Sequence, residues 1–571
     1  TKRDLYEFYG AVAPWILPYL ESRPLVLTRY PDGIAGKSFY QKNVPVSTPE
    51  WIRTESVRSE SSEKAIEYFV ADDRATLLYL ANLGSIPLHV WASRIGSIDR
   101  PDWCVIDLDP KGAPFEHVVA VARVLHDVCE DIGLESFVKT SGSTGLHVML
   151  PLGRSCTYGQ SRSLGELLAG RTSRNLVRVF LLGEELKRRG KKHPHGIERV
   201  HVVGAGVMGA DIAIWTASRG FAVTLQDRHP EILARAMQKA HAFYRKKLKQ
   251  PRAVQEAMDR LMPDLRGDGL ARADLVIEAI VENVDAKRGL FTDVEARVRP
   301  TTLLASNTSS IPLEEIATAL KDPARLVGLH FFNPVAQMQL VEIVRGAQSG
   351  EDALNRARGF ATALDRLPLD VKSSPGFLVN RVLMPYLIEA MKLVEEGVPL
   401  AEIDGAALDF GMPMGPIRLA DTVGLDICLS VAEELSGPLN IQVPQRLRNM
   451  VAAGQLGIKS GSGFYQYDAR GKPTKGGSRE PRNEPITERL ILRMVNESVA
   501  CLREGVVADL DSIDAGMVYG TGFAPYLGGP MRYADTLGDV GIRASLDRLA
   551  EEYGQRFQPD AGWLQRELFQ R

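Results

Sequence analysis

The sequence predicts a multidomain α/β protein in which an α+β module precedes a doubly wound parallel sheet and an all-helical region. From residue 197 onward, strand-like and helix-like segments alternate, which is typical of a parallel sheet with helices on both faces. After Pro375 the apolar residues recur with helical spacing. Before residue 170, short apolar runs and turns follow one another without that alternation, so a different fold is expected there.

The composition is that of an ordinary globular protein. At roughly 100–200 residues per domain, the 571 residues predict about three to five domains. The formal net charge of -2 neither favours nor excludes an acidic partner. No apolar run is long enough for a membrane span, and the first residues lack the pattern of a signal peptide. The five cysteines are scattered, which disfavours a zinc site or disulfide framework and favours a reducing, cytoplasmic location.

Residues 1–170 are predicted to form the α+β module. Strands are expected at residues 25–30 and 103–110, and a helix is expected from residue 115 to a stop at Gly133. Residues 136–152 read as a strand, a Ser/Gly loop and another strand.

Residues 171–196 are predicted to be a linker helix that ends in a basic stretch. The run from Lys187 to Lys192 is interpreted as a solvated helix end rather than a nucleic-acid patch. The sequence pattern changes abruptly within residues 162–178, which suggests a truncated fusion, and an error of gene assembly would give the same pattern.

A glycine-rich turn follows the strand expected before residue 204. Gly204, Gly206 and Gly209 form GxGxxG, in which the glycines permit a tight turn, approach of the backbone to a pyrophosphate, and close helix–strand packing. Asp227 ends the next strand, where an acid accepts hydrogen bonds from the adenine ribose and repels a 2′-phosphate. We therefore expect a Rossmann domain at residues 197–374 that binds NAD rather than NADP, although the adjacent Arg228 leaves NADP open.

The helical region contains an internal repeat. Residues 395–424 align with residues 503–538, with Glu-Gly-Val, Ile-Asp, Gly-Pro and Ala-Asp-Thr in the same order. This predicts two helical domains, at residues 375–470 and 486–571, joined by a polar, Gly/Pro-rich loop.

Four polar residues stand in mostly apolar surroundings beyond the glycine turn: Ser309, His330, Glu342 and Asn380. Taken singly, they can be a cap, a satisfied core histidine, a buried ion-pair partner and a polar helix residue. Together they supply what oxidation of a secondary alcohol requires. A histidine can act as the base, a carboxylate can orient it, and hydroxyl and amide groups can hold the substrate oxygen.

The surrounding motifs carry a close resemblance to a known family. They are VVGAGVMGADIA, EAIVEN, ASNTSS, LHFFNPV, LVEIV, PGFLVNR, GMPMGPIRLADTVGLD and GSGFY. Residues 197–470 resemble 3-hydroxyacyl-CoA dehydrogenases. With residues 486–571 and the preceding RNLVRVFLLGEELK, the chain from about residue 171 resembles the C-terminal half of the bacterial multifunctional fatty-acid oxidation α subunit.

The resemblance implies NAD-dependent oxidation of 3-hydroxyacyl-CoA to 3-ketoacyl-CoA in fatty-acid β-oxidation. It makes His330 and Glu342 the catalytic pair, with Ser309 and Asn380 at the substrate oxygen. It also implies that the cofactor or substrate cleft is lined by Asp227, Glu282, Lys287 and Asn307. The helical domains would close over the acyl chain and support a homo-oligomer, and a thiolase subunit is a candidate partner. The hydratase domain that precedes this region in the α subunits is absent, so no hydratase activity is expected.

Asp107 and Asp109 end the strand expected at residues 103–110. Two carboxylates on one strand face can bind Mg²⁺ or Mn²⁺, although two acids that open a turn explain the spacing equally well. A Ser/Gly loop that suits a triphosphate adds Lys139, Ser141, Ser143 and His147.

The module's motifs resemble the polymerase domain of bacterial DNA ligase D, which has a primase-like fold. They are LTRYPDGIAGKSFYQKN, NLGSIPLHVWASR, WCVIDLDP and KTSGSTGLHV. The resemblance implies that Asp107 and Asp109 bind metal and that His147 contacts nucleotide. The family's third metal carboxylate has no match, so we expect an incomplete module, inactive in nucleotidyl transfer, with a vestigial metal site. A nucleic-acid-binding or polymerase protein with a vestigial dehydrogenase is the alternative, and the complete set of four polar residues disfavours it.

Overall fold

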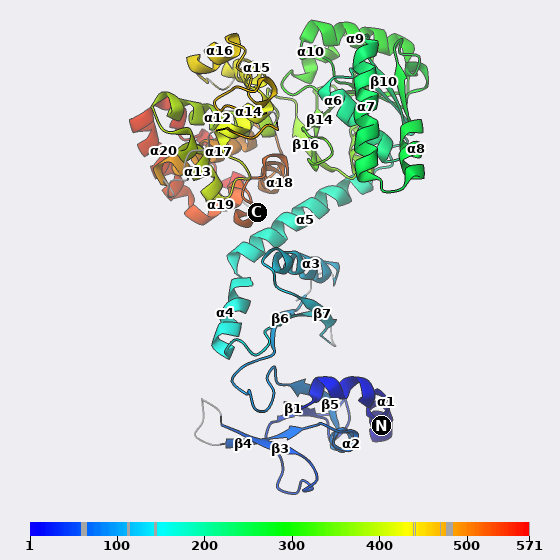
Figure 1. Ribbon diagram of the computed structural model, residues 1–571, viewed down its shortest axis with the longest axis vertical. Helices are drawn as coiled ribbons and strands as arrows, with labels where there is room; N and C mark the ends of the chain where they lie inside the picture. The colour runs from blue at the N-terminus through cyan, green and yellow to red at the C-terminus, as the bar shows by residue number, and fades with distance from the viewer. Residues whose placement is uncertain are drawn as a thin grey trace. The chain divides into compact units, whose positions relative to one another are not determined.

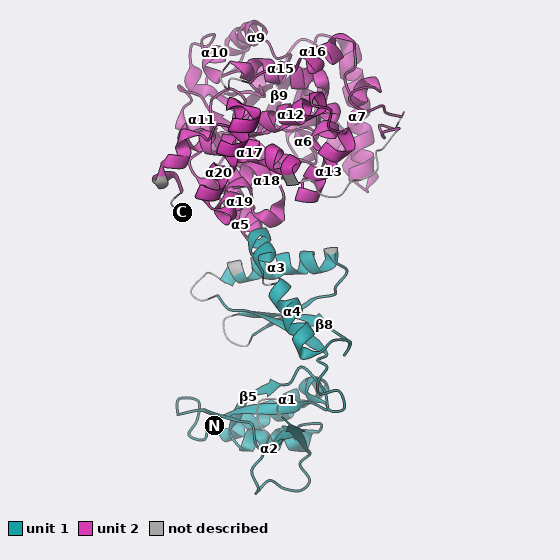
Figure 2. Ribbon diagram, turned by 90° about the vertical axis from the view of Figure 1, so that its left-hand side faces the viewer, with its two compact units in different colours: residues 1–177 teal, residues 178–571 magenta. Residues whose placement is uncertain are grey.

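The computed structural model describes residues 1–571 except 59–64, 111–114, 142–144, 169, 438, 440, 469, 475–483 and 570–571. The chain divides into two compact units, residues 1–177 and 178–571, which Figure 2 colours separately. The division falls within α5 (Arg171–Lys191), the helix predicted as a linker. Over the described residues, no helix combines the length and apolarity that crossing a membrane requires.

The first unit contains two antiparallel sheets, each with its own hydrophobic core. The five-stranded sheet has the order β2-β1-β4-β3, with β5 also paired to β1, and the three-stranded sheet has the order β6-β8-β7. The strands are β1 (Pro24–Arg29), β2 (Phe39–Gln41), β3 (Thr54–Arg58), β4 (Ala65–Val70), β5 (Ser85–Val90), β6 (Trp103–Leu108), β7 (Phe137–Thr140) and β8 (Leu146–Pro151). The helices are α1 (Lys2–Leu20), α2 (Arg74–Asn82), α3 (Phe115–Asp131) and α4 (Tyr158–Leu168). The strands expected at residues 25–30 and 103–110 are both present.

The second unit begins with an eight-stranded sheet in the order β11-β10-β9-β12-β13-β14-β15-β16 (Figure 1, green). Its strands are β9 (Arg199–Val203), β10 (Ala222–Gln226), β11 (Leu261–Asp264), β12 (Leu275–Glu278), β13 (Leu303–Ser306), β14 (Leu326–Phe331), β15 (Leu340–Arg345) and β16 (Leu367–Lys372). Its helices are α6 (Val207–Ser218), α7 (Pro230–Lys247), α8 (Pro251–Asp259), α9 (Val284–Arg297), α10 (Leu313–Ala317) and α11 (Glu351–Ala363).

The sheet departs from the predicted parallel arrangement at one pair, because β14 and β15 are antiparallel. Only residues 332–339 connect these strands. A parallel crossover needs about a dozen residues or more, so this connection can only return the chain in the opposite direction.

Helices cover both faces of the sheet, as the alternating pattern predicts. Leu275 and Ile277 of β12 pack in the core with α6, α7 and α11. Val276, between them, packs in the core with α9 and α10. Because neighbouring side chains on a strand point to opposite faces, a run of apolar residues is expected where both faces are buried.

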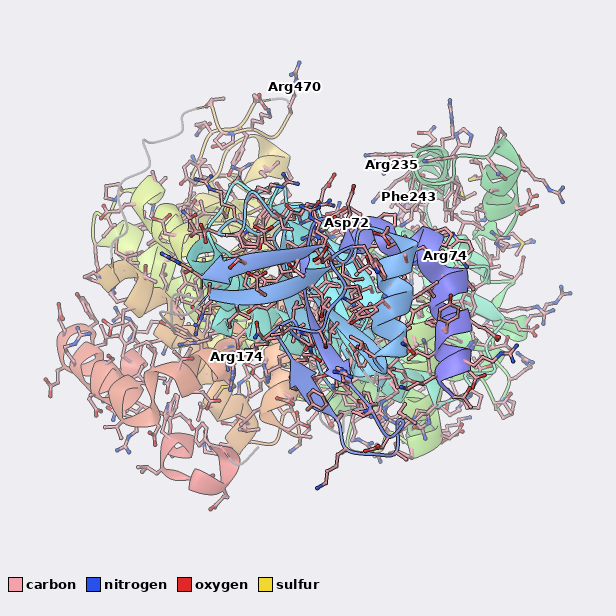
Figure 3. All side chains as sticks on the ribbon, turned by 90° about the horizontal axis from the view of Figure 1, so that it is seen from below. Asp72, Arg74, Arg174, Arg235, Phe243 and Arg470 are labelled. Atoms are coloured by element: carbon pink, nitrogen blue, oxygen red, sulfur yellow. The ribbon has the colours of Figure 1, made fainter. Side chains whose placement is uncertain are left out.

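The remainder of the second unit is helical (Figure 1, yellow to red). The first group comprises α12 (Val379–Glu395), α13 (Leu400–Phe410), α14 (Pro416–Val423), α15 (Leu425–Ser436) and α16 (Gln445–Ala452). The second group comprises α17 (Glu484–Arg503), α18 (Leu510–Thr521), α19 (Pro530–Leu537) and α20 (Asp539–Tyr553). Much of the predicted joining loop lies outside the described residues, and Arg470 at its start extends outward in Figure 3.

The two helical groups repeat one buried contact. Asp404 of α13 accepts a hydrogen bond from the backbone N–H of Ile417, 2.8 Å away, in the first turn of α14. Asp514 of α18 accepts one from the N–H of Met531, 2.7 Å away, in the first turn of α19. A carboxylate that satisfies the free N–H groups of the next helix is a stabilising cap. The same cap at corresponding positions supports the duplication read from the sequence.

The second half of α5 is part of the second unit rather than a free linker. Val179 and Leu186 are buried in its core. Arg178 donates hydrogen bonds to Asp514, 2.8 Å away, and to the carbonyl of Gly528, 2.7 Å away. At Gly183, a Cβ atom would lie 2.5 Å from the Tyr519 hydroxyl, so this glycine permits close packing on α18.

Asp404 should make the free energy of unfolding of the protein depend measurably on pH. Burial raises the pKa of Asp404 to about 6, although hydrogen bonds from Tyr465 and the α14 backbone oppose the shift. The pKa of Asp404 in the folded state exceeds its pKa in the unfolded state, which is about 3.9. The contribution of the protonated Asp404 to stability is therefore fully present below about pH 3.9 and is lost as the pH rises through the folded-state pKa. Between about pH 4 and pH 7, we expect the free energy of unfolding of the wild type to fall by about 2–3 kcal/mol more than that of Asp404→Asn. Urea denaturation at both pH values measures the difference, and parallel pH dependences would contradict it.

Candidate active site

His330 and Glu342 face each other across the antiparallel pair of β14 and β15. His330 Nδ1 lies 2.6 Å from Glu342 Oε2. The histidine is 5% exposed and the glutamate 0% exposed. A buried carboxylate that engages Nδ1 fixes the orientation of the ring, which leaves Nε2 as the nitrogen for proton exchange with a ligand.

The first turn of α12 holds the other oxygen of Glu342. Oε1 accepts hydrogen bonds from the backbone N–H groups of Leu378, 3.1 Å away, and Val379, 3.0 Å away. The start of a helix carries a partial positive charge and free N–H groups, both of which stabilise an anion. The helical region therefore completes the support of the His330–Glu342 pair, a contribution that the sequence did not reveal.

An unusual turn aims these N–H groups at Glu342. Gly376 has φ +73° and Phe377 has φ +50°, and the left-handed conformation is uncommon for a bulky residue. The Phe377 ring is fully buried with its centroid 5.7 Å from that of His330, and the Phe332 ring lies 4.5 Å from His330. These two rings give the histidine an apolar surround.

Asn380 of α12 contacts Ser309, which lies on the loop after β13. Asn380 Nδ2 donates a hydrogen bond to the Ser309 carbonyl, 3.2 Å away. The Ser309 N–H donates to Glu282 Oε1, 2.9 Å away. Asn380 directly follows Val379, so a single helical turn contacts both the loop with Ser309 and the carboxylate of Glu342. The structure thus connects all four predicted catalytic residues in one region.

Lys287 lies in a buried ion cluster next to this loop. Its Nζ is 2.6 Å from Glu278 Oε1 and 3.1 Å from Glu282 Oε2, and its side chain is 1% exposed. Glu278 is fully buried, and its other oxygen accepts a hydrogen bond from the Ser306 hydroxyl, 2.6 Å away. Sequence reasoning missed Glu278, whose only signal was an acid at the end of the strand in VIEAIVEN.

Glu282 and Asn307 are held by the same network. Burial alone would raise the pKa of Glu282, but Lys287 and hydrogen bonds from the loop after β13 lower it below its usual value. Asn307 Oδ1 accepts a hydrogen bond from the N–H of Phe331, 2.9 Å away, which links this loop to the strand that carries His330. Glu282 also lines a cleft of about 440 Å³, together with Ser310, Pro312, Pro375 and Glu434.

The glycine turn has the shape required for a dinucleotide pyrophosphate. Gly204 has φ +100°, and a Cβ atom there would overlap the carbonyl of Ala279. A Cβ atom at Gly209 would overlap the carbonyl of Gly204. Gly206 begins α6 without a side-chain cap, so the helix N-terminus can receive a phosphate. Asp227 Oδ2 accepts a hydrogen bond from the N–H of Ala205, 2.9 Å away, which fixes the acid beside the turn.

Gly204→Ala should weaken NADH binding at least about 10-fold, because the left-handed conformation alone costs about 1–2 kcal/mol in a residue with Cβ. The overlap with Ala279 would shift the turn further. Fluorescence titration with NADH measures the change. Gly289→Ala is the matched control, since a Cβ atom at that helical glycine would point into open space. Equal affinities for Gly204→Ala and the wild type would refute the assignment.

The residues predicted to bind metal lie in the first unit. Asp107 of β6 faces His147 of β8, whose Nε2 lies 3.3 Å from Asp107 Oδ1. The Asp107 side chain is 58% exposed, and Lys139 of β7 faces His147 from the other side. Ser143 lies outside the described residues. Within the described ranges, no three His, Cys, Asp or Glu side chains are grouped as a metal site would require, so the donors present do not fit a two-metal centre.

Comparison with known proteins divides the chain similarly. Residues 199–374 match the NAD-binding domain of 3-hydroxyacyl-CoA dehydrogenase. Residues 376–467 and 486–570 match the C-terminal domain of that enzyme. Residues 1–192 match the primase-polymerase domain of LigD.

Individual relatives agree with these matches. The fatty acid oxidation complex subunit alpha of Pseudomonas entomophila is 35% identical over 432 residues, which are 70% of this chain and 60% of that protein. The Pseudomonas putida (strain GB-1) protein of the same name is 35% identical over 442 residues, 72% of this chain and 62% of that protein. The chain therefore spans somewhat under two thirds of the length of these relatives. The crystal structure of Escherichia coli 3-hydroxybutyryl-CoA dehydrogenase is 28% identical with a TM-score of 0.57, and the match covers 66% of this chain and 99% of that chain.

Proposed function

The chain belongs, through residues 199–570, to the 3-hydroxyacyl-CoA dehydrogenase family, and on this premise we propose that it oxidises 3-hydroxyacyl-CoA to 3-ketoacyl-CoA with NAD⁺ in fatty-acid β-oxidation. The observation that carries the proposal is the buried His330–Glu342 pair, anchored by the first turn of α12. A histidine that serves only the core needs no such arrangement next to a serine loop and an asparagine.

In this proposal, His330 removes the proton from the 3-hydroxyl group through Nε2. Glu342 stabilises the imidazolium that results, and the amides of Leu378 and Val379 hold the Glu342 carboxyl group in place. Ser309 and Asn380 hold the substrate oxygen as its charge changes. NAD⁺ bound at the glycine turn would supply the hydride acceptor. Asp227, Glu282, Lys287 and Asn307 shape the cofactor end of the cleft, with Lys287 acting through the two glutamates it binds.

The direct test is the loss of NADH absorbance when the purified full chain is mixed with acetoacetyl-CoA. Turnover with NADH and much weaker turnover with NADPH is the expected result, because Asp227 would repel a 2′-phosphate. NADH binding without turnover on any 3-ketoacyl-CoA would overturn the proposed activity.

The partners are proposed by the same reasoning. An acyl-CoA is the proposed substrate, and since two similar Pseudomonas proteins are named as subunits of a complex, association with a thiolase subunit and self-association are both proposed. Light scattering of the purified chain, alone and with a thiolase subunit, tests them. The five free cysteines accord with the reducing, cytoplasmic location proposed from the sequence.

For residues 1–192, the LigD match favours nucleotidyl transfer as a second candidate function. We propose that this module is inactive in it, with at most a vestigial Mg²⁺ or Mn²⁺ site at Asp107 and Asp109. The support is chemical, because among the described residues the two exposed carboxylates beside His147 are not joined by the third acid that a two-metal centre uses. Extension of primed DNA with Mn²⁺ and nucleotide that disappears in Asp107→Ala would overturn the proposal.

A further inference from the structure

Arg381 directly follows Asn380 in the first turn of α12 and points toward the second helical group. It is 5% exposed. Its Nε lies 2.8 Å from Glu497 Oε1, and its Nη1 lies 2.6 Å from Glu504 Oε2. Glu497 belongs to α17 and Glu504 follows the end of that helix. A guanidinium group that binds two carboxylates from two nitrogens is fixed in direction as well as in distance.

The contact extends into the second group as a chain of ion pairs. Glu504 also pairs with Arg503, 2.9 Å away, and Arg503 pairs with Asp560, 2.8 Å away. Burial alone would lower the pKa of Arg381, but Glu504 and Glu497 raise it above its usual value, so the group remains charged. Arg381 is thus bound to side chains that are themselves paired within the second helical group.

The same helical turn carries the contacts that join the helical region to Glu342 and to the loop of Ser309. The N–H groups of Leu378 and Val379 hold Glu342, and Asn380 holds the loop of Ser309. These contacts lie within one turn of Arg381, since an α-helix has about 3.6 residues per turn. A shift of the turn along or about its axis would therefore disturb Glu342 and Asn380 together.

We infer that Arg381 is a positioning residue, through which the second helical repeat fixes Asn380 and the amides that hold Glu342. The inference rests on the proposed dehydrogenase function and assigns the second repeat a role in it. The ion pairs of Arg381 are with Glu497 and Glu504 rather than with His330 or Glu342, so it acts through its neighbours in α12.

The chain contains a matched control in Arg489 of α17. The Arg489 side chain is 5% exposed and pairs with Glu389, 2.5 Å away, and Glu396, 2.7 Å away. It therefore joins the same two helices by the same kind of buried, two-carboxylate contact. Glu389 lies nine residues beyond Asn380, which is about 13 Å along the helix at about 1.5 Å per residue. If the ion pairs served only to hold the helices together, the two arginines would be equivalent.

Arg381→Met and Arg489→Met should both lower the melting temperature. Only Arg381→Met should lower the single-turnover rate of NADH oxidation by acetoacetyl-CoA, about 10-fold. The steady-state KM for acetoacetyl-CoA should change little. A misplacement of about 1 Å in catalytic groups costs up to about 10²-fold. Arg381→Lys keeps the positive charge but cannot bind both carboxylates through two nitrogens, so its single-turnover rate should be intermediate. In an Asn380→Ala background, Arg381→Met should lower the single-turnover rate by a clearly smaller factor than in the wild type, because both changes act through the placement of Asn380.

Hydrogen exchange gives a readout that does not depend on turnover. The N–H groups of Leu378 and Val379 should exchange faster in Arg381→Met than in Arg489→Met. If Arg381→Met does not fold, Glu497→Gln with Glu504→Gln removes the partners instead. Equal kinetic losses in the two arginine variants, additive losses with Asn380→Ala, or unchanged exchange at Leu378 and Val379 would overturn the inference. An inactive wild type that shows the expected exchange pattern would count against the proposed function and not against the positioning role.

Discussion

We expect His330→Gln to lower kcat for the reduction of acetoacetyl-CoA at least about 10²-fold, the range usual for removal of a general acid or base. Glutamine can still donate a hydrogen bond to Glu342, but it cannot exchange a proton with the substrate oxygen. The affinity for NADH should remain unchanged, because the glycine turn and Asp227 follow other strands, β9 and β10. Steady-state kinetics and an NADH fluorescence titration measure the two quantities.

His201→Gln is the control for this variant. His201 is fully buried in the same sheet, where its ring nitrogens lie 2.6 Å from Thr224 Oγ1 and 2.8 Å from Gln226 Oε1. It should retain the turnover of the wild type when corrected for folded protein. A His330→Gln variant as active as His201→Gln would remove His330 from the role of base.

Lys287→Met should be strongly destabilising, by about 3–5 kcal/mol, the cost typical of leaving a buried charge without its partner. The fully buried Glu278 would lose its cation, and Glu282 would lose one of the groups that keep it ionised. Urea denaturation measures the free energy of unfolding. Adding Glu278→Gln to Lys287→Met should recover part of the loss, because it removes the stranded charge.

The exposed pair of Arg252 and Glu256 provides the comparison, since Arg252→Ala should change stability little. A loss for Lys287→Met no larger than that for Arg252→Ala would mean that the cluster around Glu278 does not hold a buried charge pair.

Local chemistry explains which parts of the site could be predicted from the sequence. The glycine turn was predictable because two of its requirements are local: Gly204 has a positive φ, and a Cβ atom at Gly209 would overlap the Gly204 carbonyl. The strands that carry His330 and Glu342 were also predictable one by one. Their register was not, because it depends on the short return of residues 332–339, and a shift by one residue would turn either side chain to the other face.

Other features depended on contacts distant in sequence. Family resemblance implied Lys287 at the cleft, but the strand that supplies Glu278 gave no sign that this glutamate would be its buried partner. The second half of α5 was read as a linker, yet it packs into the core. Gly183 and Gly190, seven residues apart and so on one face of the helix, were the available signal, because interior helical glycines commonly permit close packing.

The ion pair between Arg178 and Asp514 forms late relative to the synthesis of α5. These residues are 336 positions apart, so the contact can form only after most of the polypeptide has left the ribosome. At about 5–20 residues per second, the interval is roughly 20–70 s. Throughout this time the apolar side of α5 lacks its final partners, and the nascent chain must keep that helix from associating elsewhere until translation reaches α18 and α19.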